Sequence, residues 1–176
     1  KDMKTQARLA SFVLFVICAS AASAEDRAAA FVKLFEDWCL SRVDDPARDW
    51  ERAYPEDGRA SSQAFAVNGK FVTTFERIYD ASGLSLTQEQ HSCAVSDVSP
   101  WLSEQDQEAV LAQATQLMAT RFPALQRKDD PDLGWDIHRV WTDGPAGTEA
   151  ATWGVILMRV GQDLPGTTLT LALPRQ

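Results

Sequence analysis

The chain has 176 residues, 45% of them hydrophobic, and its 25 acidic and 17 basic residues give a formal net charge of −8. This length is typical of one domain with a single hydrophobic core. The acidic balance argues against binding to nucleic acid or to anionic membrane surfaces, since both require clusters of Lys and Arg.

The first 24 residues have the pattern of a secretory signal peptide. Lys4 and Arg8 form a basic start, an apolar stretch follows, and residues 22–24 are the small residues Ala-Ser-Ala. Signal peptidase cuts after such a pattern, so we predict cleavage between Ala24 and Glu25 and export to the periplasm or the medium.

A membrane anchor and a lipoprotein are the weaker interpretations of this segment. The apolar stretch is too short for a stable membrane span, and Ile17 stands before Cys18 where a lipoprotein needs a small residue. Cleavage would leave residues 25–176 as a single compact secreted domain. Residues 1–24 hold three basic residues and one acidic residue, so the net charge of the mature chain would be about −10.

Two helices are predicted at the start of this domain. Apolar residues recur at helical spacing from about Asp26 to Arg42, and Cys39 lies on the flank of that stripe, so its thiol is expected to face the core. Asp45 is a typical N-cap and Pro46 suits the first helical position, which predicts a second short helix through Trp50 to Tyr54.

The next stretch indicates β-structure. Asn68-Gly69 lies between two β-prone segments and predicts a tight hairpin turn. Residues 70–80 fit a strand better than a helix, although a helix remains the alternative, and residues 83–87 (GLSLT) are interpreted as a loop. Cys93 and Val95 then alternate with smaller or polar residues, as in a half-buried strand.

One long helix is predicted between Trp101 and Phe122. Ser103 is the expected N-cap, Asp106 occupies the third helical position of a capping box, and Pro123 follows the end. Its buried stripe is expected to consist of Val110, Leu111, Ala114, Leu117 and Met118.

The final third predicts three strands, Ile137–Thr142, Ala151–Val160 and Thr167–Leu173, the last two joined as an antiparallel hairpin. Residues 154–160 (GVILMRV) are almost continuously apolar, which predicts a central strand covered on both faces. The expected fold is therefore α+β, with two N-terminal helices, an antiparallel sheet of about five or six strands and one long helix packed on the sheet.

Cleavage would remove Cys18 and leave Cys39 and Cys93, which we predict to form a disulfide in an oxidising compartment. Free thiols and a zinc or copper site are the alternatives. Such a metal site would combine both thiolates with His91 and His138, but only His91 and Cys93 are close in sequence.

An acidic stretch suggests a calcium site. Asp130, Asp132 and Asp136 are oxygen donors, but an EF-hand loop starting at Asp130 would place Trp141 where a bidentate Glu is needed, so a solvated acidic turn is expected.

The chain has six tryptophans. Trp38 and Trp153 are predicted to be core residues. Trp50, Trp101 and Trp135 fall in loops or at element ends, where they either line a groove for a ligand or partner or cover the edge of a small core.

Catalytic signatures for serine hydrolases, nucleotide-binding loops, thioredoxins and c-type haem proteins are absent from the sequence. We therefore predict a non-enzymatic binding or adaptor domain without a cofactor, whose partner is a protein with a basic surface or a small ligand. We predict no nucleic-acid binding and no stable membrane insertion after cleavage. The alternatives are a small hydrolase or metal-dependent enzyme that uses His91 and His138, and a metal carrier that uses these histidines with Cys39 and Cys93.

Overall fold

The structure is a computed structural model. It describes residues 27–45, 59–67, 70–79, 82–129, 137–145, 151–160 and 166–173, and within 59–79 and at 137, 138 and 160 it describes the backbone alone. Several predictions lie outside the described residues. These are the signal segment, the short helix at 50–54, the turn at Asn68-Gly69, the side chains of Trp50 and Trp135, and the acidic turn at Asp130, Asp132 and Asp136.

The domain begins with a single continuous helix, here called the N-terminal helix (residues 27–44). Residues 27–34 are α-helical, η1 (Phe35–Leu40) is a π-helical segment, and α2 (Ser41–Asp44) returns to α-helical geometry. Phe31, Phe35 and Cys39 are fully buried. The predicted apolar stripe is therefore the face that packs on the rest of the domain.

The sheet has eight antiparallel strands. They are β1 (Arg59–Val67), β2 (Lys70–Tyr79), β3 (Leu84–Gln88), β4 (Ser92–Asp97), β5 (Gln126–Asp129), β6 (Ile137–Thr142), β7 (Gly154–Val160) and β8 (Gly166–Ala172). Their order is β1-β2-β3-β4-β8-β7-β6-β5. The sheet thus consists of two four-stranded meanders, β1–β4 and β5–β8, which join where β4 pairs with β8 in the centre.

The strand count exceeds the five or six expected because the alternation of Leu84 and Leu86 with Ser85 and Thr87 was not interpreted as a strand, and because β5 lacks an apolar pattern. β3 covers residues that we interpreted as a loop, and that interpretation is wrong because Leu84 and Leu86 are buried and the strand pairs with both β2 and β4. β5 consists of four exposed polar and charged residues at the edge of the sheet. Edge strands commonly carry charges that discourage further pairing, so they show no apolar alternation.

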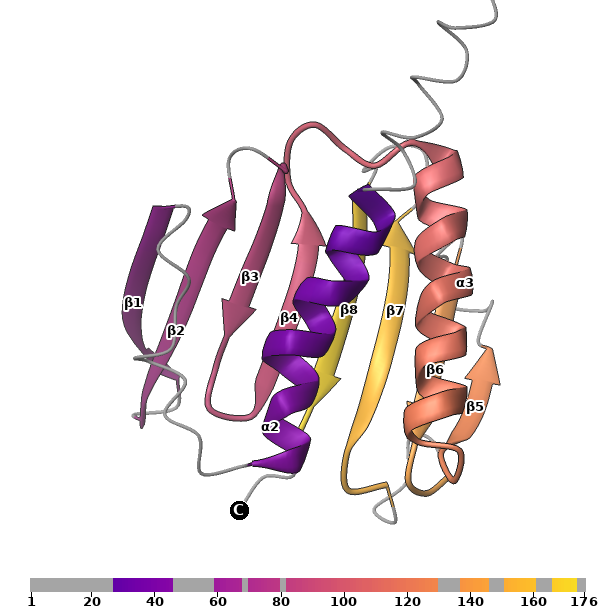
Figure 1. Cartoon of the computed structure of the whole chain (residues 1–176). Coiled ribbons are helices and arrows are strands. Elements are labelled where there is room, and N and C mark those ends of the chain that lie inside the picture. Colours follow the sequence, from indigo (N-terminus) through magenta and orange to yellow (C-terminus); the bar gives the residue numbers. More distant parts are fainter. Residues whose placement is uncertain are drawn as a thin grey trace, which may run out of the picture.

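The predicted long helix is α3 (Glu104–Arg121). Ser103 is its N-cap, and the Ser103 and Asp106 side chains form the predicted capping box. Figure 1 shows α3 and the N-terminal helix on the same face of the sheet, with the N-terminal helix in front of β4 and β8 and α3 beside it toward β6. The predicted α+β class is confirmed.

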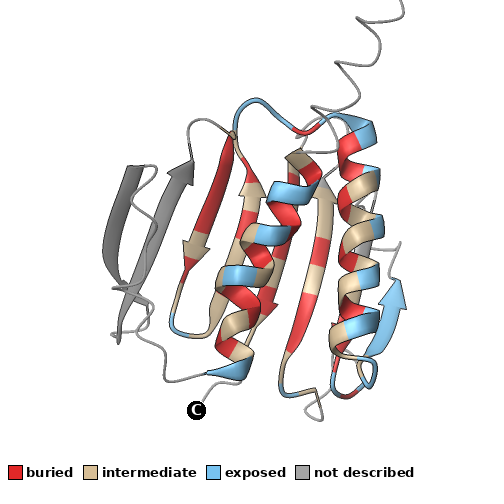
Figure 2. Cartoon of the chain, in the orientation of Figure 1, coloured by how far each residue is buried: buried red, intermediate tan, exposed pale blue. Residues whose placement is uncertain are grey.

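The core lies between the two helices and this face of the sheet, as the buried helix stripes in Figure 2 indicate. In α3 the buried apolar residues are Val110, Ala114 and Met118, whereas Leu111 and Leu117 are only partly buried. The register aligns the buried residues of four central strands in one row, which consists of Leu86, Val95, Leu169 and Leu157.

The opposite face of the sheet carries no helix in the described part of the chain. In β7, Val155 and Leu157 are buried on the helix side, while Ile156 and Met158 point to the other side and are only half-buried. Among the described residues, the helices cover this strand on one side alone, which differs from the predicted cover on both faces. Ile156 and Met158, on the side without a described helix, complete the continuous apolar pattern of the strand.

Candidate functional site

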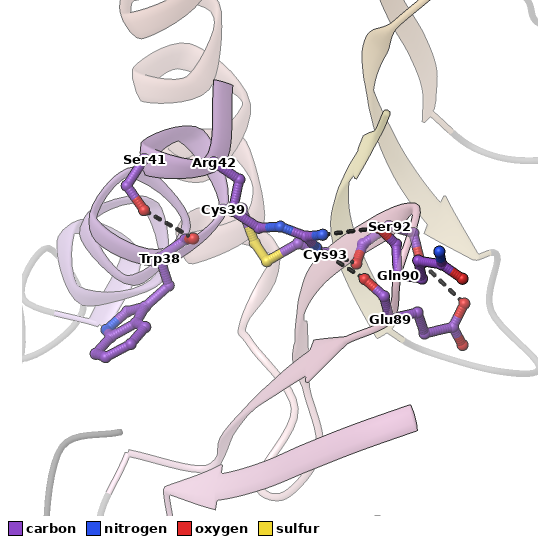
Figure 3. Close-up of a disulfide and its surroundings, with 8 residues drawn as sticks. All are labelled: Trp38, Cys39, Ser41, Arg42, Glu89, Gln90, Ser92 and Cys93. Carbon is purple, nitrogen blue, oxygen red and sulfur yellow. Dashed lines mark hydrogen bonds between the residues drawn. A yellow bond between two sulfur atoms is a disulfide. The ribbon is translucent and has the colours of Figure 1, made fainter. Parts of the chain in front are cut away.

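Cys39 and Cys93 form the predicted disulfide, with a Cα–Cα distance of 5.3 Å. Cys39 comes from η1 and Cys93 from β4, and both residues are fully buried. Figure 3 shows how the bond ties the helix to the central strands. Both sulfur atoms are used, so neither residue is a free nucleophile or a thiolate ligand for a metal.

Arg42 reinforces this link one helical turn further on. Its Nη1 atom donates to the carbonyl oxygens of Glu89 and Ser92 at 2.8 and 2.9 Å, and its Nη2 atom donates to the carbonyl oxygen of Gln90 at 2.8 Å. The residue is 95% buried, with 5% of its surface exposed. The guanidinium therefore caps the turn between β3 and β4 (Figure 3).

The two histidines lie at opposite ends of the sheet. His91 belongs to the turn before β4, where its carbonyl oxygen accepts from the amide of Leu173 at 2.8 Å. His138 pairs with Met158, which the register aligns with Ser96, near the far end of β4. Strand spacing and rise place their backbones roughly 20 Å apart. The enzyme alternative required these histidines in one site, and the backbone register separates them.

A second cluster of polar contacts shapes the loop that carries Trp101, defined here as the Trp101 loop (residues 98–103). The Asp97 carboxylate, almost fully buried, accepts from the backbone amides of Leu102 at 2.8 Å and of Thr167. The Gln107 side-chain amide donates to the carbonyl oxygen of Leu102 at 3.0 Å. The loop is thus bound to both β8 and α3.

Arg27, in the first turn of the N-terminal helix, holds the other side of the Trp101 loop. It donates to the carbonyl oxygens of Ser82 at 2.9 Å, of Trp101 at 3.2 Å and of Pro100. Gly83 approaches the loop so closely that a Cβ atom there would lie 2.3 Å from the carbonyl oxygen of Ser99. Four separate segments therefore converge on this loop and restrict its backbone.

The loop presents one aromatic side chain to solvent. Trp101 is 50% exposed, and it is the only large hydrophobic residue exposed among those that the structure describes. Its ring lies over the start of β8, since a Cβ atom on Gly166 would be 3.5 Å from the ring atom Cζ3. Glu104 and Gln105, in the first turn of α3, are exposed next to it in sequence. A Trp on a restrained loop is suited to bind a partner without reordering.

Three tryptophans were predicted to line a groove, and the structure describes one of them, Trp101. Trp50 and Trp135 lie outside the described residues. Trp153 packs at the end of α3, where its ring meets that of Phe122 edge to face at 5.2 Å. Trp38 is partly buried against the core. Both positions agree with the predicted role in the core.

The shifted carboxyl pKa values in the described part of the chain belong to structural contacts. The pKa of Asp129 is lowered to about 2, chiefly by the hydrogen bond from Arg127 and also by Arg139, against an opposing effect of burial. For Asp143, burial raises the pKa, but hydrogen bonds from Thr152 and Trp153 outweigh it and lower the pKa overall. Within the described residues, no three His, Cys, Asp or Glu side chains gather as a metal site would require.

Sequence reasoning missed Arg27, Arg42 and Asp97. Two of them left a signal, because Arg42 follows Cys39 by three residues on the buried stripe and Asp97 continues the alternation of Cys93 and Val95. A charged residue at a predicted core position is an indication of a buried hydrogen-bond network. Arg27 left none, since its three acceptors are backbone carbonyls distant in sequence.

None of the helices in the described ranges is long and apolar enough to cross a membrane. Comparisons of the chain with models of protein families, with curated proteins and with solved structures found no match.

Proposed function

We propose that this chain is a secreted, non-enzymatic binding domain that contacts a basic protein partner through Trp101. The observation that carries the proposal is the half-exposed Trp101 on a loop held by Arg27, Asp97 and Gln107. Trp residues are enriched among those that dominate binding energy, and a restrained loop loses little entropy on binding.

Charge supports a basic partner. The chain has eight more acidic than basic residues, and Glu104 is exposed in the helical turn that follows Trp101. The Arg27 side chain, the nearest described cation in the loop's contacts, already donates to three carbonyl oxygens. A partner segment with Lys or Arg beside an apolar residue would complement both the ring and the Glu104 carboxylate.

A random peptide library displayed on phage, selected on the purified chain, tests this proposal directly. Peptides that contain basic residues should be enriched, and Trp101→Ala should weaken their binding at least about tenfold, as expected for a central Trp. Gln116→Ala, at an exposed position of α3, is the matched control and should leave binding unchanged. If the selected peptides bind the Trp101→Ala variant as well as the wild type, the role of Trp101 is refuted.

Secretion is supported by the signal-like residues 1–24 and by the buried disulfide, a bond typical of oxidising compartments. Expression of the full chain in a bacterial host and intact-mass measurement of the periplasmic fraction would test it. We expect a chain that begins at Glu25 and contains no free thiol. An uncut chain in the membrane fraction would indicate an anchor, and a reduced chain in the cytoplasm would contradict export.

A further inference from the structure

The start of β8 leaves a small space beside the Trp101 ring, here called the Gly166 notch. A Cβ atom on Gly166 would lie 3.5 Å from the ring atom Cζ3 of Trp101 and 3.6 Å from the Oδ1 atom of Asp97. In the described part of the chain, apart from the sequence neighbours of Gly166, these two residues supply the three heavy atoms nearest to this point. The notch therefore has an aromatic wall and a carboxylate wall, with room for one group of the size of a methyl or an ammonium.

The notch lies next to the exposed part of the Trp101 loop. Trp101 is 50% exposed and Gly166 is half-buried. Gly166 pairs with Val160 at the end of the ladder between β7 and β8. Because glycine has no side chain, nothing of its own fills the notch. A side chain of a partner that packs on Trp101 can therefore enter it.

The carboxylate at the notch carries a buried charge. Asp97 is 3% exposed, and its Oδ1 and Oδ2 atoms accept one hydrogen bond each, from the backbone amides of Thr167 and Leu102. Each carboxylate oxygen has room for a second donor. Both present donors are uncharged, and no Lys or Arg side chain among the described residues binds Asp97. A buried carboxylate attracts a cation strongly because little water screens the charge, so the notch favours a positive group.

Thr167 provides an independent indication that a donor belongs here. Its Oγ1 atom has no hydrogen-bond partner, although the residue is only 2% exposed. Buried hydroxyl groups rarely stay unpaired, because they have lost their hydrogen bonds to water. Thr167 follows Gly166 in sequence, and its amide already binds the Asp97 carboxylate. An ammonium group has three N–H donors, so it can bind the carboxylate and still supply a further acceptor.

Two arginines lie near this end of the sheet, and both have other partners. Arg27 donates to three backbone carbonyl oxygens on the other side of the Trp101 loop. Arg159 is paired with Thr167 in the register, and its Nη1 atom lies 3.5 Å from the Oε1 atom of Glu108 in α3. A cation that complements Asp97 is therefore expected to come from outside the chain.

We propose that the Gly166 notch takes the side chain of a Lys from the protein partner. The aliphatic part of this Lys packs on the Trp101 ring, and its ammonium group donates to the Asp97 carboxylate. The ammonium is compact and fits the notch, whereas the planar guanidinium of Arg is wider. This inference rests on the proposed function, because it names the residue that the partner presents to Trp101.

Three phage libraries test the preference for Lys. Each displays nine-residue peptides with Lys, Arg or Met fixed at the centre and with no other basic residue, and each is selected on the purified wild-type chain. We expect the Lys library to be enriched at least about tenfold more than the other two, since a charged hydrogen bond to a buried group contributes at least this factor. Equal enrichment of the Arg or the Met library would overturn the proposal.

Gly166→Ala tests the notch itself. The added methyl group fills the space in ordinary contact with Trp101 and Asp97, so the chain should stay folded. The selected Lys peptides should nevertheless bind this variant at least about tenfold more weakly. Gln116→Ala, at an exposed position of α3, is the matched control and should bind them as the wild type does.

Synthetic peptides then show whether the notch and the ammonium group act together. Norleucine in place of the central Lys removes the ammonium group and should weaken binding to the wild type at least about tenfold. The same replacement should have little effect on binding to Gly166→Ala, because the two changes remove one interaction. Full and independent effects of the two changes would place the ammonium group outside the notch and overturn the proposal.

Trp101→Ala separates this inference from the proposed function. Peptides that lose binding to Trp101→Ala but bind Gly166→Ala as tightly as the wild type use the ring without the notch, which overturns this inference alone. Peptides that bind Trp101→Ala as tightly as the wild type contradict the proposed function as well. Failure of all three libraries to yield a binder would contradict both.

Discussion

Cys39 in the N-terminal helix is bonded to Cys93 in β4 across 54 positions of sequence. A cross-link over a loop of this length stabilises a domain by about 4 kcal/mol through the entropy of the unfolded chain. We therefore expect the double variant Cys39→Ala/Cys93→Ala to lose about that much unfolding free energy in urea titrations. Reduction of the wild type should lower its stability similarly. An unchanged stability in both cases would show that the bond does not constrain the unfolded state.

Arg42 is predicted to contribute strongly to stability because it satisfies three carbonyl oxygens of the β3–β4 turn. Arg42→Ala leaves these acceptors without the guanidinium, and we expect a loss of about 2 to 4 kcal/mol in unfolding free energy. Arg42→Lys keeps the charge but not the fork of donors, so it should recover only part of the loss. Full recovery by Lys would indicate that charge, rather than geometry, matters here.

Asp129 predicts a specific acid sensitivity. Its pKa is about 2 in the folded chain and about 3.9 in an unfolded one, so its contacts with Arg127 and Arg139 stabilise the fold above that upper value. This contribution should disappear as the pH falls from about 4 to about 2.

The variant Asp129→Asn should therefore show a smaller decline of stability over this pH interval than the wild type. Asp45→Asn, which removes a carboxylate from an exposed residue at the end of α2, is the matched control. Thermal unfolding at a series of pH values provides the comparison. Because the Asp129 side chain is 50% exposed, high salt should reduce the difference between the variant and the wild type. Parallel acid profiles for Asp129→Asn and the wild type would contradict this assignment.

Substitution by alanine should lower the stability at one of the two glycines beside the Trp101 loop and hardly change it at the other. Gly83 has φ +66° and no space for a Cβ atom next to Ser99, so Gly83→Ala should cost about 1 to 2 kcal/mol or more. The loop would have to shift, and the fluorescence of Trp101 should change with it. At Gly166 a Cβ atom meets only ordinary contacts with Trp101 and Asp97, so Gly166→Ala should change stability by less than about 0.5 kcal/mol. Equal effects of the two substitutions would show that the loop is not held as the structure indicates.

The sequence determined the local features of this protein. Apolar periodicity located the N-terminal helix, α3 and the strands around Cys93 and in the final third, because each buries one face against the core. The capping box at Ser103 and Asp106 and the pairing of Cys39 with Cys93 also followed from the sequence. These features depend on neighbouring residues, or, for the disulfide, on there being only two cysteines after the signal segment.

The tertiary structure decided how these elements relate to one another. β5 forms because β6 supplies its hydrogen bonds, since its own residues show no apolar pattern, and the short alternation in β3 becomes a strand because β2 and β4 pair with it. The separation of His91 from His138 follows from strand order and register, which local periodicity does not encode. The contacts of Arg27 are likewise long-range, as is the position of both described helices on one side of β7, since they depend on which segments the folded chain brings together.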